Sequence, residues 1–216
     1  MYKKIMKAVG IVGYKKSGKT SLTLKIAEKL GKKYRVGIIK HAEKFDEKES
    51  DTKKFSEKYV TGYVSAKKSG IIFPEKKSLE EIISYLNVDI LLIEGFKNNR
   101  SFPKITCGDY EDDLAIASDK DSLDHIIEKI ERYGFKLPNL NCGRCGYTCE
   151  KMASMIIKGE ASIEECQQLN ETEIRINGRK INLNRFVSDL VKNVVTSIVH
   201  SLRESEKGII EIKVKK

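Results

Sequence analysis

Residues 13–20 carry the pattern of a phosphate-binding loop, G-x-x-x-x-G-K-[ST], in the form Gly-Tyr-Lys-Lys-Ser-Gly-Lys-Thr. Gly13 and Gly18 allow backbone N–H groups to turn toward a polyphosphate. Lys19 can reach the outer phosphate oxygens, and the Thr20 hydroxyl can ligate Mg²⁺. The spacing therefore predicts a nucleotide site whose side-chain cation is Lys19.

A nucleotide-hydrolysing loop also needs an acidic partner that orders Mg²⁺ or the attacking water. Glu94 is the candidate, because it ends the apolar run 88–93 and Gly95 permits a sharp exit from a strand. Asp89 begins the same run and would lie at the wrong end of the strand. The alternative for Glu94 is an exposed charge at the end of a strand.

Two further polar candidates lie at or beyond the end of the predicted second strand, residues 34–41. His41 ends that strand, although a single histidine is more often structural than functional. Asp51 lies in the polar segment 42–58, where its carboxylate could swing onto the metal or simply face solvent.

Four cysteines, Cys142, Cys145, Cys149 and Cys166, have the spacing C-x2-C-x3-C-x16-C. Disulfides are not expected in a cytosolic chain, so a metal site is favoured. Three close cysteines with a distant fourth suit a cubane cluster, and the segment resembles a small four-cysteine [4Fe–4S] domain. Zinc and free thiols are the alternatives. Cys107 is interpreted as a plain loop or core thiol.

Strand and helix signals alternate over the first 137 residues, which predicts an α/β fold with a mainly parallel sheet. The predicted strands are residues 8–12, 34–41, 88–95 and 114–118, with short apolar runs at 60–65 and 69–73. The predicted helices are residues 21–30, 79–86 and 123–133, the second capped by Ser78 with Ile82, Ile83 and Leu86 inward. Ligands bind at the carboxyl ends of such strands, where Glu94, His41 and Asp119 would lie.

Three domains are expected: residues 1–137 for the nucleotide-binding sheet, 138–170 for the cysteines, and 171–216 for a small C-terminal module. The middle stretch has few apolar residues, so metal binding should contribute much of its folding energy. The last stretch predicts a hairpin around Asn177-Gly178, then a helix with an apolar face over 187–202. Gly208 should end this helix, and residues 209–214 should form a closing strand. The apolar helix face must pack on its sheet or on a partner.

The composition excludes some classes of protein. No apolar run is long enough to span a bilayer, and the first residues lack the features of a signal peptide, so a cytoplasmic location is expected. The formal charge is +10, but lysines alternate with glutamates. This pattern favours a solvated surface over a nucleic-acid-binding stripe.

In order and spacing, the phosphate loop, Lys40-His41, Asp51-Thr52 and Glu94-Gly95-Phe96-Lys97 resemble the molybdopterin-guanine dinucleotide biosynthesis protein B (MobB) family, over roughly residues 5–133. The resemblance implies a P-loop protein that binds GTP and hydrolyses it slowly. It implies partners too: the guanylyltransferase that joins GMP to molybdopterin, or molybdopterin-bearing proteins. A homodimer is expected.

By this resemblance, Thr20, Asp51 and Glu94 would surround Mg²⁺. The phosphates would be held by Gly13, Tyr14, Lys15, Lys16, Ser17, Gly18, Lys19, Thr20 and Ser21. The wider class often carries a lysine where this chain has Tyr14, which puts a lysine reaching across a dimer in doubt.

The usual guanine-reading motif of GTPases is missing, and Asp119 is the candidate to meet a guanine edge. A second hypothesis for the whole chain is a nucleotide-gated iron–sulfur protein that transfers electrons or senses redox state. A third is a scaffold that binds nucleotide without useful turnover.

Overall fold

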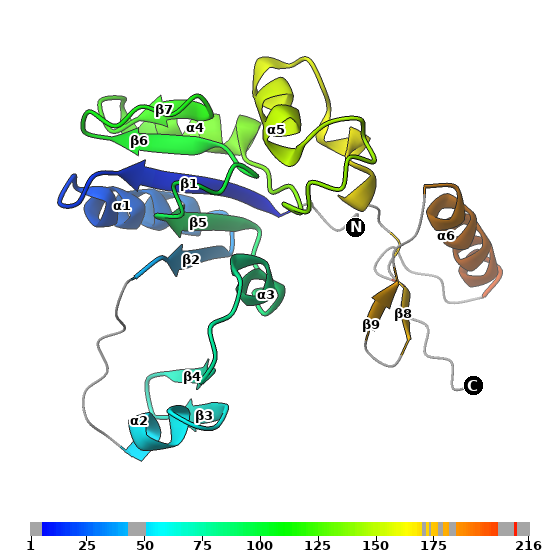
Figure 1. Cartoon of the computed structure of the whole chain (residues 1–216), viewed down its shortest axis with the longest axis horizontal. Helices are drawn as coiled ribbons and strands as arrows, with labels where there is room; N and C mark the ends of the chain where they lie inside the picture. The colour runs from blue at the N-terminus through cyan, green and yellow to red at the C-terminus, as the bar shows by residue number, and fades with distance from the viewer. Residues whose placement is uncertain are drawn as a thin grey trace. The chain divides into compact units, whose positions relative to one another are not determined.

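The computed structural model describes residues 6–42, 51–169, 172, 174–176, 179–181, 185–202 and 210. Its centre is a five-stranded sheet with the strand order β2-β5-β1-β6-β7 (Figure 1). These strands are β2 (Val36–Lys40), β5 (Ile90–Glu94), β1 (Lys7–Gly13), β6 (Lys104–Cys107) and β7 (Ala115–Ser118). β1 pairs in parallel with β5 and β6, and β6 pairs in parallel with β7. The predicted α/β fold with a mainly parallel sheet is confirmed.

β6 is a strand that the sequence patterns did not indicate. All four of its residues are buried, including Lys104. Its run Lys-Ile-Thr-Cys contains a charge and follows Pro103, so it lacks the apolar continuity by which buried strands are recognised. It lies beside β1, with Gly13 opposite Cys107.

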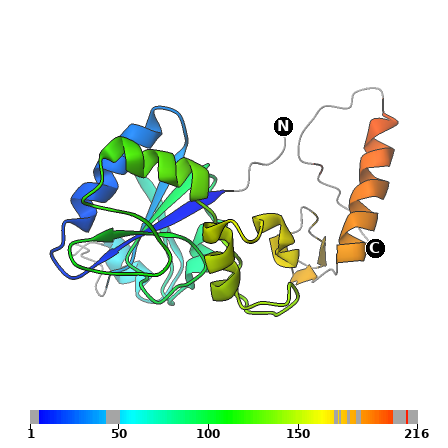
Figure 2. The same cartoon turned by 90° about the horizontal axis from the view of Figure 1, so that it is seen from above.

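Two helices cover one face of the sheet, α1 (Lys19–Gly31) and α4 (Leu123–Tyr133) (Figure 2). Both were predicted, although α1 begins two residues earlier than the periodicity indicated. Their inward residues are spaced by one helical turn, so they form a continuous apolar stripe. The core of this face contains Val9, Ile11, Ile26, Leu30, Ile90, Leu92, Ile105, Cys107, Ile126 and Ile130.

Residues 40–87 form a separate compact unit. It contains α2 (Asp51–Ser56), the antiparallel hairpin of β3 (Thr61–Val64) and β4 (Ser69–Ile72), and α3 (Leu79–Ser84). Ser78 caps α3, as predicted, and the structure shows that it does so in a reciprocal capping box with Glu81. The prediction that Leu86 faces inward is wrong, because α3 ends at Ser84 and Leu86 is exposed.

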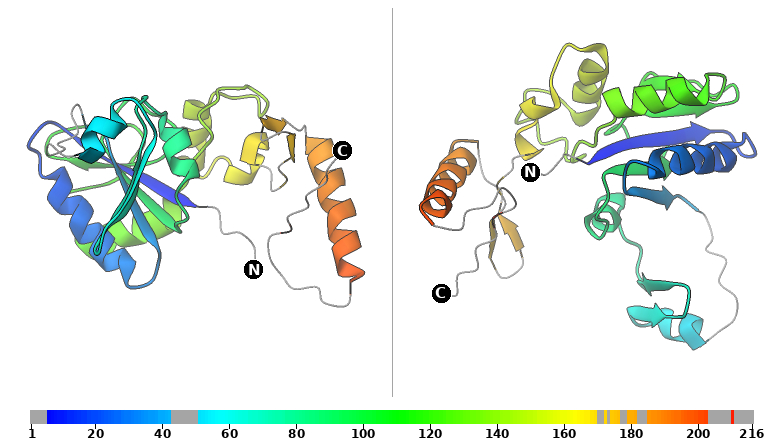
Figure 3. Two further views of the ribbon diagram at one scale, coloured as in Figure 1. Left: turned by 90° about the horizontal axis from the view of Figure 1, so that it is seen from below. Right: turned by 180° about the vertical axis from the view of Figure 1, so that it is seen from behind.

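The cysteine segment packs against the sheet domain. It contains α5 (Cys149–Lys158) and the short 3₁₀ turns η1 (Ile163–Glu165) and η2 (Gln167–Leu169). Figures 1 and 3 show α5 at the end of the sheet where β1 begins. Its apolar core is shared with the sheet domain and contains Leu114, Phe135, Leu137, Met152, Ala153 and Cys166. We call residues 138–169 with this core the cysteine lobe.

The C-terminal segment contains the antiparallel strands β8 (Ile174–Ile176) and β9 (Arg179–Ile181), as the Asn177-Gly178 signal predicts. α6 (Arg185–His200) follows and ends at His200, not at Gly208 as expected. Gly208 and all of the predicted closing strand except Ile210 lie outside the described residues, and Ile210 has no regular secondary structure. No helix in the described part of the chain is long and apolar enough to cross a membrane.

Candidate nucleotide and metal sites

The predicted phosphate loop joins the carboxyl end of β1 to the amino end of α1. A Cβ atom on Gly13 would lie 2.5 Å from Ser17 Oγ and 2.7 Å from the Cys107 carbonyl oxygen, so only glycine fits there. Gly18 is left-handed, with φ 81°, and is the N-cap of α1 without a side chain. Backbone N–H groups of the helix start can therefore face an anion bound in the loop.

Lys19 reaches back across the loop. Its Nζ donates hydrogen bonds to the carbonyl oxygen of Tyr14 and, over 3.3 Å, to Ser17 Oγ. The ammonium group thus lies over the backbone that would surround the phosphates. Its role in binding phosphate stays a prediction from the loop motif.

Thr20 and Glu94, which the sequence assigned to the same metal, are in direct contact. The Thr20 hydroxyl donates to Glu94 Oε1 over 2.9 Å. Glu94 is the last residue of β5 and its side chain is buried, so the alternative of an exposed strand-end charge is wrong. A hydroxyl and a carboxylate oxygen, the kind of donor that Mg²⁺ prefers, therefore lie together where the end of β5 meets the start of α1.

Cys107 lies beneath this loop at the end of β6, as a buried core thiol. Burial, together with the carboxylates of Asp119 and Glu94, raises the pKa of Cys107 to about 11, although Lys19 opposes this shift. The thiol therefore stays protonated at neutral pH. It is a poor metal ligand or nucleophile, because both roles need the thiolate.

Asp119 follows β7, at the same edge of the sheet as Glu94. Its Oδ2 accepts a hydrogen bond from the Gly108 N–H over 3.0 Å, and its own N–H donates to the Thr106 carbonyl over 2.8 Å. The carboxylate is thus fixed beside the loop that follows β6. Its role as a guanine reader stays a prediction.

His41 and Asp51 belong to the unit of residues 40–87. His41 follows β2 and is exposed. Asp51 is the first residue of α2, and its side chain lies outside the described residues. Their nucleotide and metal roles stay predictions.

Two residues near the phosphate loop were missed at the sequence level, Lys97 and Tyr110. The rings of Tyr14 and Tyr110 meet edge to face, with centroids 5.4 Å apart. Lys97 Nζ lies 4.8 Å from the Tyr14 centroid and 4.6 Å from the Tyr110 centroid, in cation–π range of both. The only sequence feature that pointed to Lys97 was its place at the end of the Glu-Gly-Phe-Lys element. No sequence feature pointed to Tyr110.

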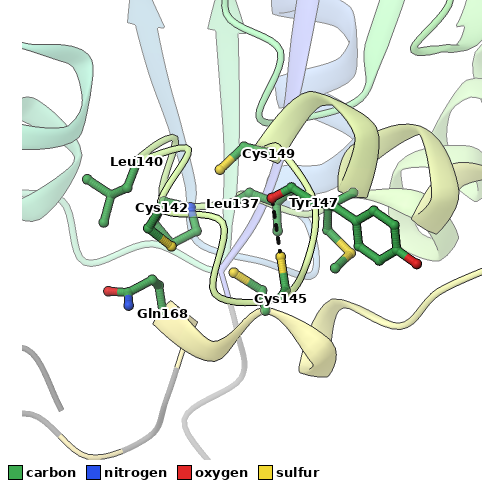
Figure 4. Close-up of a pocket in the computed structure, with 10 residues that line it drawn as sticks. Leu137, Leu140, Cys142, Cys145, Tyr147, Cys149 and Gln168 are labelled. Carbon is green, nitrogen blue, oxygen red and sulfur yellow. Dashed lines mark hydrogen bonds between the residues drawn. The ribbon is translucent and has the colours of Figure 1, made fainter. Parts of the chain in front are cut away.

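The four predicted metal ligands, Cys142, Cys145, Cys149 and Cys166, line one pocket, and none of them forms a disulfide (Figure 4). Cys145 Sγ donates to the Tyr147 carbonyl over 3.6 Å. Asn141 Oδ1 accepts from the Cys149 N–H over 2.8 Å, which fixes the start of α5 against the loop. The fold therefore collects four thiols that span 25 residues of sequence.

The donor set of this pocket consists of four cysteine thiols, which are ligands for both iron–sulfur clusters and zinc. Among the described residues, no three His, Cys, Asp or Glu side chains meet closely enough to ligate a single ion. Burial raises the pKa of Cys166, whereas backbone hydrogen bonds from Gln168 and Leu169 lower it; such bonds also stabilise cluster thiolates.

Arg100 joins the cysteine lobe to the sheet domain. Its guanidinium donates to Asp112 Oδ1 over 2.8 Å, to Glu150 Oε1 over 2.9 Å, and to Asp113. Glu150 directly follows Cys149 in α5. The hydrogen bond from Arg100 lowers the pKa of Asp113, so the pair is ionised at neutral pH.

The sheet and the loop after β1 define a protein of the P-loop class. The chain belongs to the MobB family: residues 8–128 match the family model described as molybdopterin guanine dinucleotide synthesis protein B. Residues 137–168 match a second model, provisionally described as an Fe-S cluster.

The chain is also similar to named proteins. It is 32% identical to a Methanocaldococcus jannaschii protein provisionally named molybdopterin-guanine dinucleotide biosynthesis adapter protein, over 92% of each chain. The crystal structure of Bacillus subtilis MobB is 22% identical, covers 58% of this chain and 98% of its own, and has a TM-score of 0.46. The Bacillus stearothermophilus MobB homologue is 24% identical, covers 47% of this chain and 63% of its own, and has a TM-score of 0.38.

Proposed function

We propose that this protein binds GTP with Mg²⁺ and acts as an adapter in the biosynthesis of molybdopterin guanine dinucleotide. The observation that carries the nucleotide site is the contact of Thr20 with the buried Glu94, below a loop that Lys19 crosses. Membership of the MobB family supports the adapter role and the choice of GTP.

The residues of the loop have separate tasks in this proposal. Backbone N–H groups at the start of α1 and the ammonium of Lys19 bind the phosphates. The oxygens of Thr20 and Glu94 would hold Mg²⁺, whose chemistry is to neutralise charge on the phosphates. A buried carboxylate can also orient a water molecule for attack, which is compatible with slow hydrolysis.

The test is titration of a fluorescent GTP analogue into the purified full chain, with and without Mg²⁺, against the matching ATP analogue. We expect binding that needs Mg²⁺ and prefers GTP. Equal affinity for ATP would contradict the guanine assignment. No binding of either nucleotide would contradict the nucleotide site.

For the cysteine lobe we propose a [4Fe–4S] cluster held by Cys142, Cys145, Cys149 and Cys166. Its support is the set of four reduced thiols around one pocket, together with the Fe-S family match. Such a cluster supplies a one-electron couple. Anaerobic purification followed by iron, sulfide and zinc assays on one sample tests it.

The partner of the adapter is proposed to be the guanylyltransferase or a molybdopterin-bearing protein, with this chain as a homodimer. Co-purification with a guanylyltransferase and detection of bound pterin test the first part, and the molar mass from light scattering tests the second. A reversible low-potential couple that GTP shifts, without bound pterin, would instead favour the nucleotide-gated redox protein.

A further inference from the structure

Two connections of the sheet run between its two ends without a helix. β5, β1, β6 and β7 are parallel, so the chain must return from the carboxyl end of one strand to the amino end of the next. The first return loop is residues 95–103, between β5 and β6, and the second is residues 108–114, between β6 and β7. Figure 1 shows the phosphate loop at one end of the sheet and α5 at the other.

Both return loops contact the phosphate site at one end. The first follows Glu94 directly and contributes Lys97, whose ammonium lies over the rings of Tyr14 and Tyr110. The second contributes Tyr110, whose ring meets that of Tyr14. A movement of the phosphate loop at Tyr14 would therefore reach both return loops.

The second return loop is anchored in the cysteine lobe at its other end. Leu114 is fully buried there, packed in one core with Met152, Ala153 and Cys166. Its carbonyl accepts the N–H of Lys104 over 2.8 Å, which fixes its backbone to β6. Only three residues separate Tyr110 at the phosphate site from Leu114 in the cysteine lobe.

Arg100 ties the two return loops together and to α5. It belongs to the first loop, and its partners Asp112 and Asp113 belong to the second. Its third partner, Glu150, follows a predicted cluster ligand, Cys149. The Asp112 side chain is only 2% exposed, so this ion pair is screened less than a surface pair.

We propose that the two return loops couple the phosphate loop to the cysteine pocket, so that loading the pocket tightens nucleotide binding. The coupling rests on the proposed function, because both sites must bind their ligands. A loaded pocket orders α5 and Leu114, and through Arg100 and Tyr110 it orders the loop that meets Tyr14. The nucleotide then binds a loop that is already ordered, so binding loses less conformational entropy.

The test measures the affinity of a non-hydrolysable fluorescent GTP analogue for the full chain, prepared anaerobically, before and after removal of iron by a chelator. We expect the iron-loaded chain to bind about tenfold tighter, within the usual range of coupling between two sites. In R100Q the ratio should fall below about twofold. R35Q is the matched control, because Arg35 pairs with Asp89 at the amino end of β5.

A second variant, Y110A, tests the return loops at their contact with the phosphate loop. It keeps the proposal testable if R100Q does not fold. Amide hydrogen exchange adds a readout that does not depend on removing iron. The GTP analogue should slow amide exchange in α5 of the wild-type protein and should leave exchange in α5 of Y110A unchanged. Equal affinity before and after iron removal would overturn the coupling, as would an unchanged ratio in both variants. The same assays distinguish this failure from failure of the proposed function. A wild-type chain that contains no iron, or that binds no nucleotide, would contradict the proposed function and not the coupling alone.

Discussion

The Thr20 hydroxyl donates to Oε1 of Glu94 over 2.9 Å and so joins the first turn of α1 to the end of β5. The two residues lie 74 positions apart in the chain. Their contact brings the phosphate-loop motif and a carboxylate that is distant in sequence to the same place in the fold. The backbone register is part of the reason, since β1 and β5 pair with Ile11 opposite Glu94, just before the phosphate loop begins.

Substitution of Lys19 should remove GTP binding. Lys19→Ala deletes the ammonium that crosses the loop, and each charge-assisted hydrogen bond contributes roughly 1.5–3 kcal/mol. We expect affinity to fall by about 100-fold or more in isothermal titration calorimetry. Lys29→Ala is the control on the same helix, since Lys29 forms an exposed ion pair with Asp124. Unchanged affinity in Lys19→Ala would contradict the nucleotide site.

Glu94→Gln should separate binding from hydrolysis. The amide oxygen can still accept from Thr20, but it has no negative charge for metal or water. We expect nucleotide affinity within about threefold and single-turnover hydrolysis slower by about 100-fold or more. Asp89→Asn changes a carboxylate beside the opposite end of the same strand and should hydrolyse GTP normally. Wild-type turnover in Glu94→Gln would leave Glu94 with a structural role alone.

The anaerobic protein should be brown and carry about four irons and four sulfides per chain. Serine in place of Cys142, Cys145, Cys149 or Cys166 should bleach it or lower its iron content. Cys107→Ala is the control, because Cys107 lies in the core under the phosphate loop. Stoichiometric zinc without iron would contradict the cluster and would not contradict the assignment of the nucleotide site.

Lys104 should make stability depend on pH. Burial lowers the pKa of Lys104 from its ordinary 10.5 to about 7, although Asp112 opposes this shift. Below pH 7 the amine is protonated in both states, so the native state bears the full cost of a buried charge. Between pH 7 and 10.5 the unfolded chain holds one more proton, so stability rises with pH in this window.

Lys104→Met removes that buried charge. Relative to the wild type, it should stabilise the protein more at pH 6 than at pH 9, by on the order of 2–3 kcal/mol. Urea unfolding at the two pH values measures the difference. A stability difference between the two proteins that is equal at pH 6 and pH 9 would show that Lys104 keeps its ordinary pKa in the native state.

The sequence by itself determined the phosphate loop, because the motif and its flanking strand and helix are local features of residues 8–31. It also determined that Glu94 ends a buried strand and that four thiols belong together, since apolar runs and cysteine spacing are legible along the chain. The capping of α3 by Ser78 and the hairpin around Asn177-Gly178 were predicted for the same reason.

Only the tertiary structure decided how distant residues combine. β6 is buried between β1 and β7, and its Lys104 lies over the Phe102 ring, 3.7 Å from the centroid, a contact that no periodicity reveals. The core of the cysteine lobe includes Leu114 and Phe135, which come from the sheet domain. Arg100 joins acids 12, 13 and 50 positions away. Such long-range pairs are set by the return of parallel strands, which places remote segments side by side, and not by any local sequence preference.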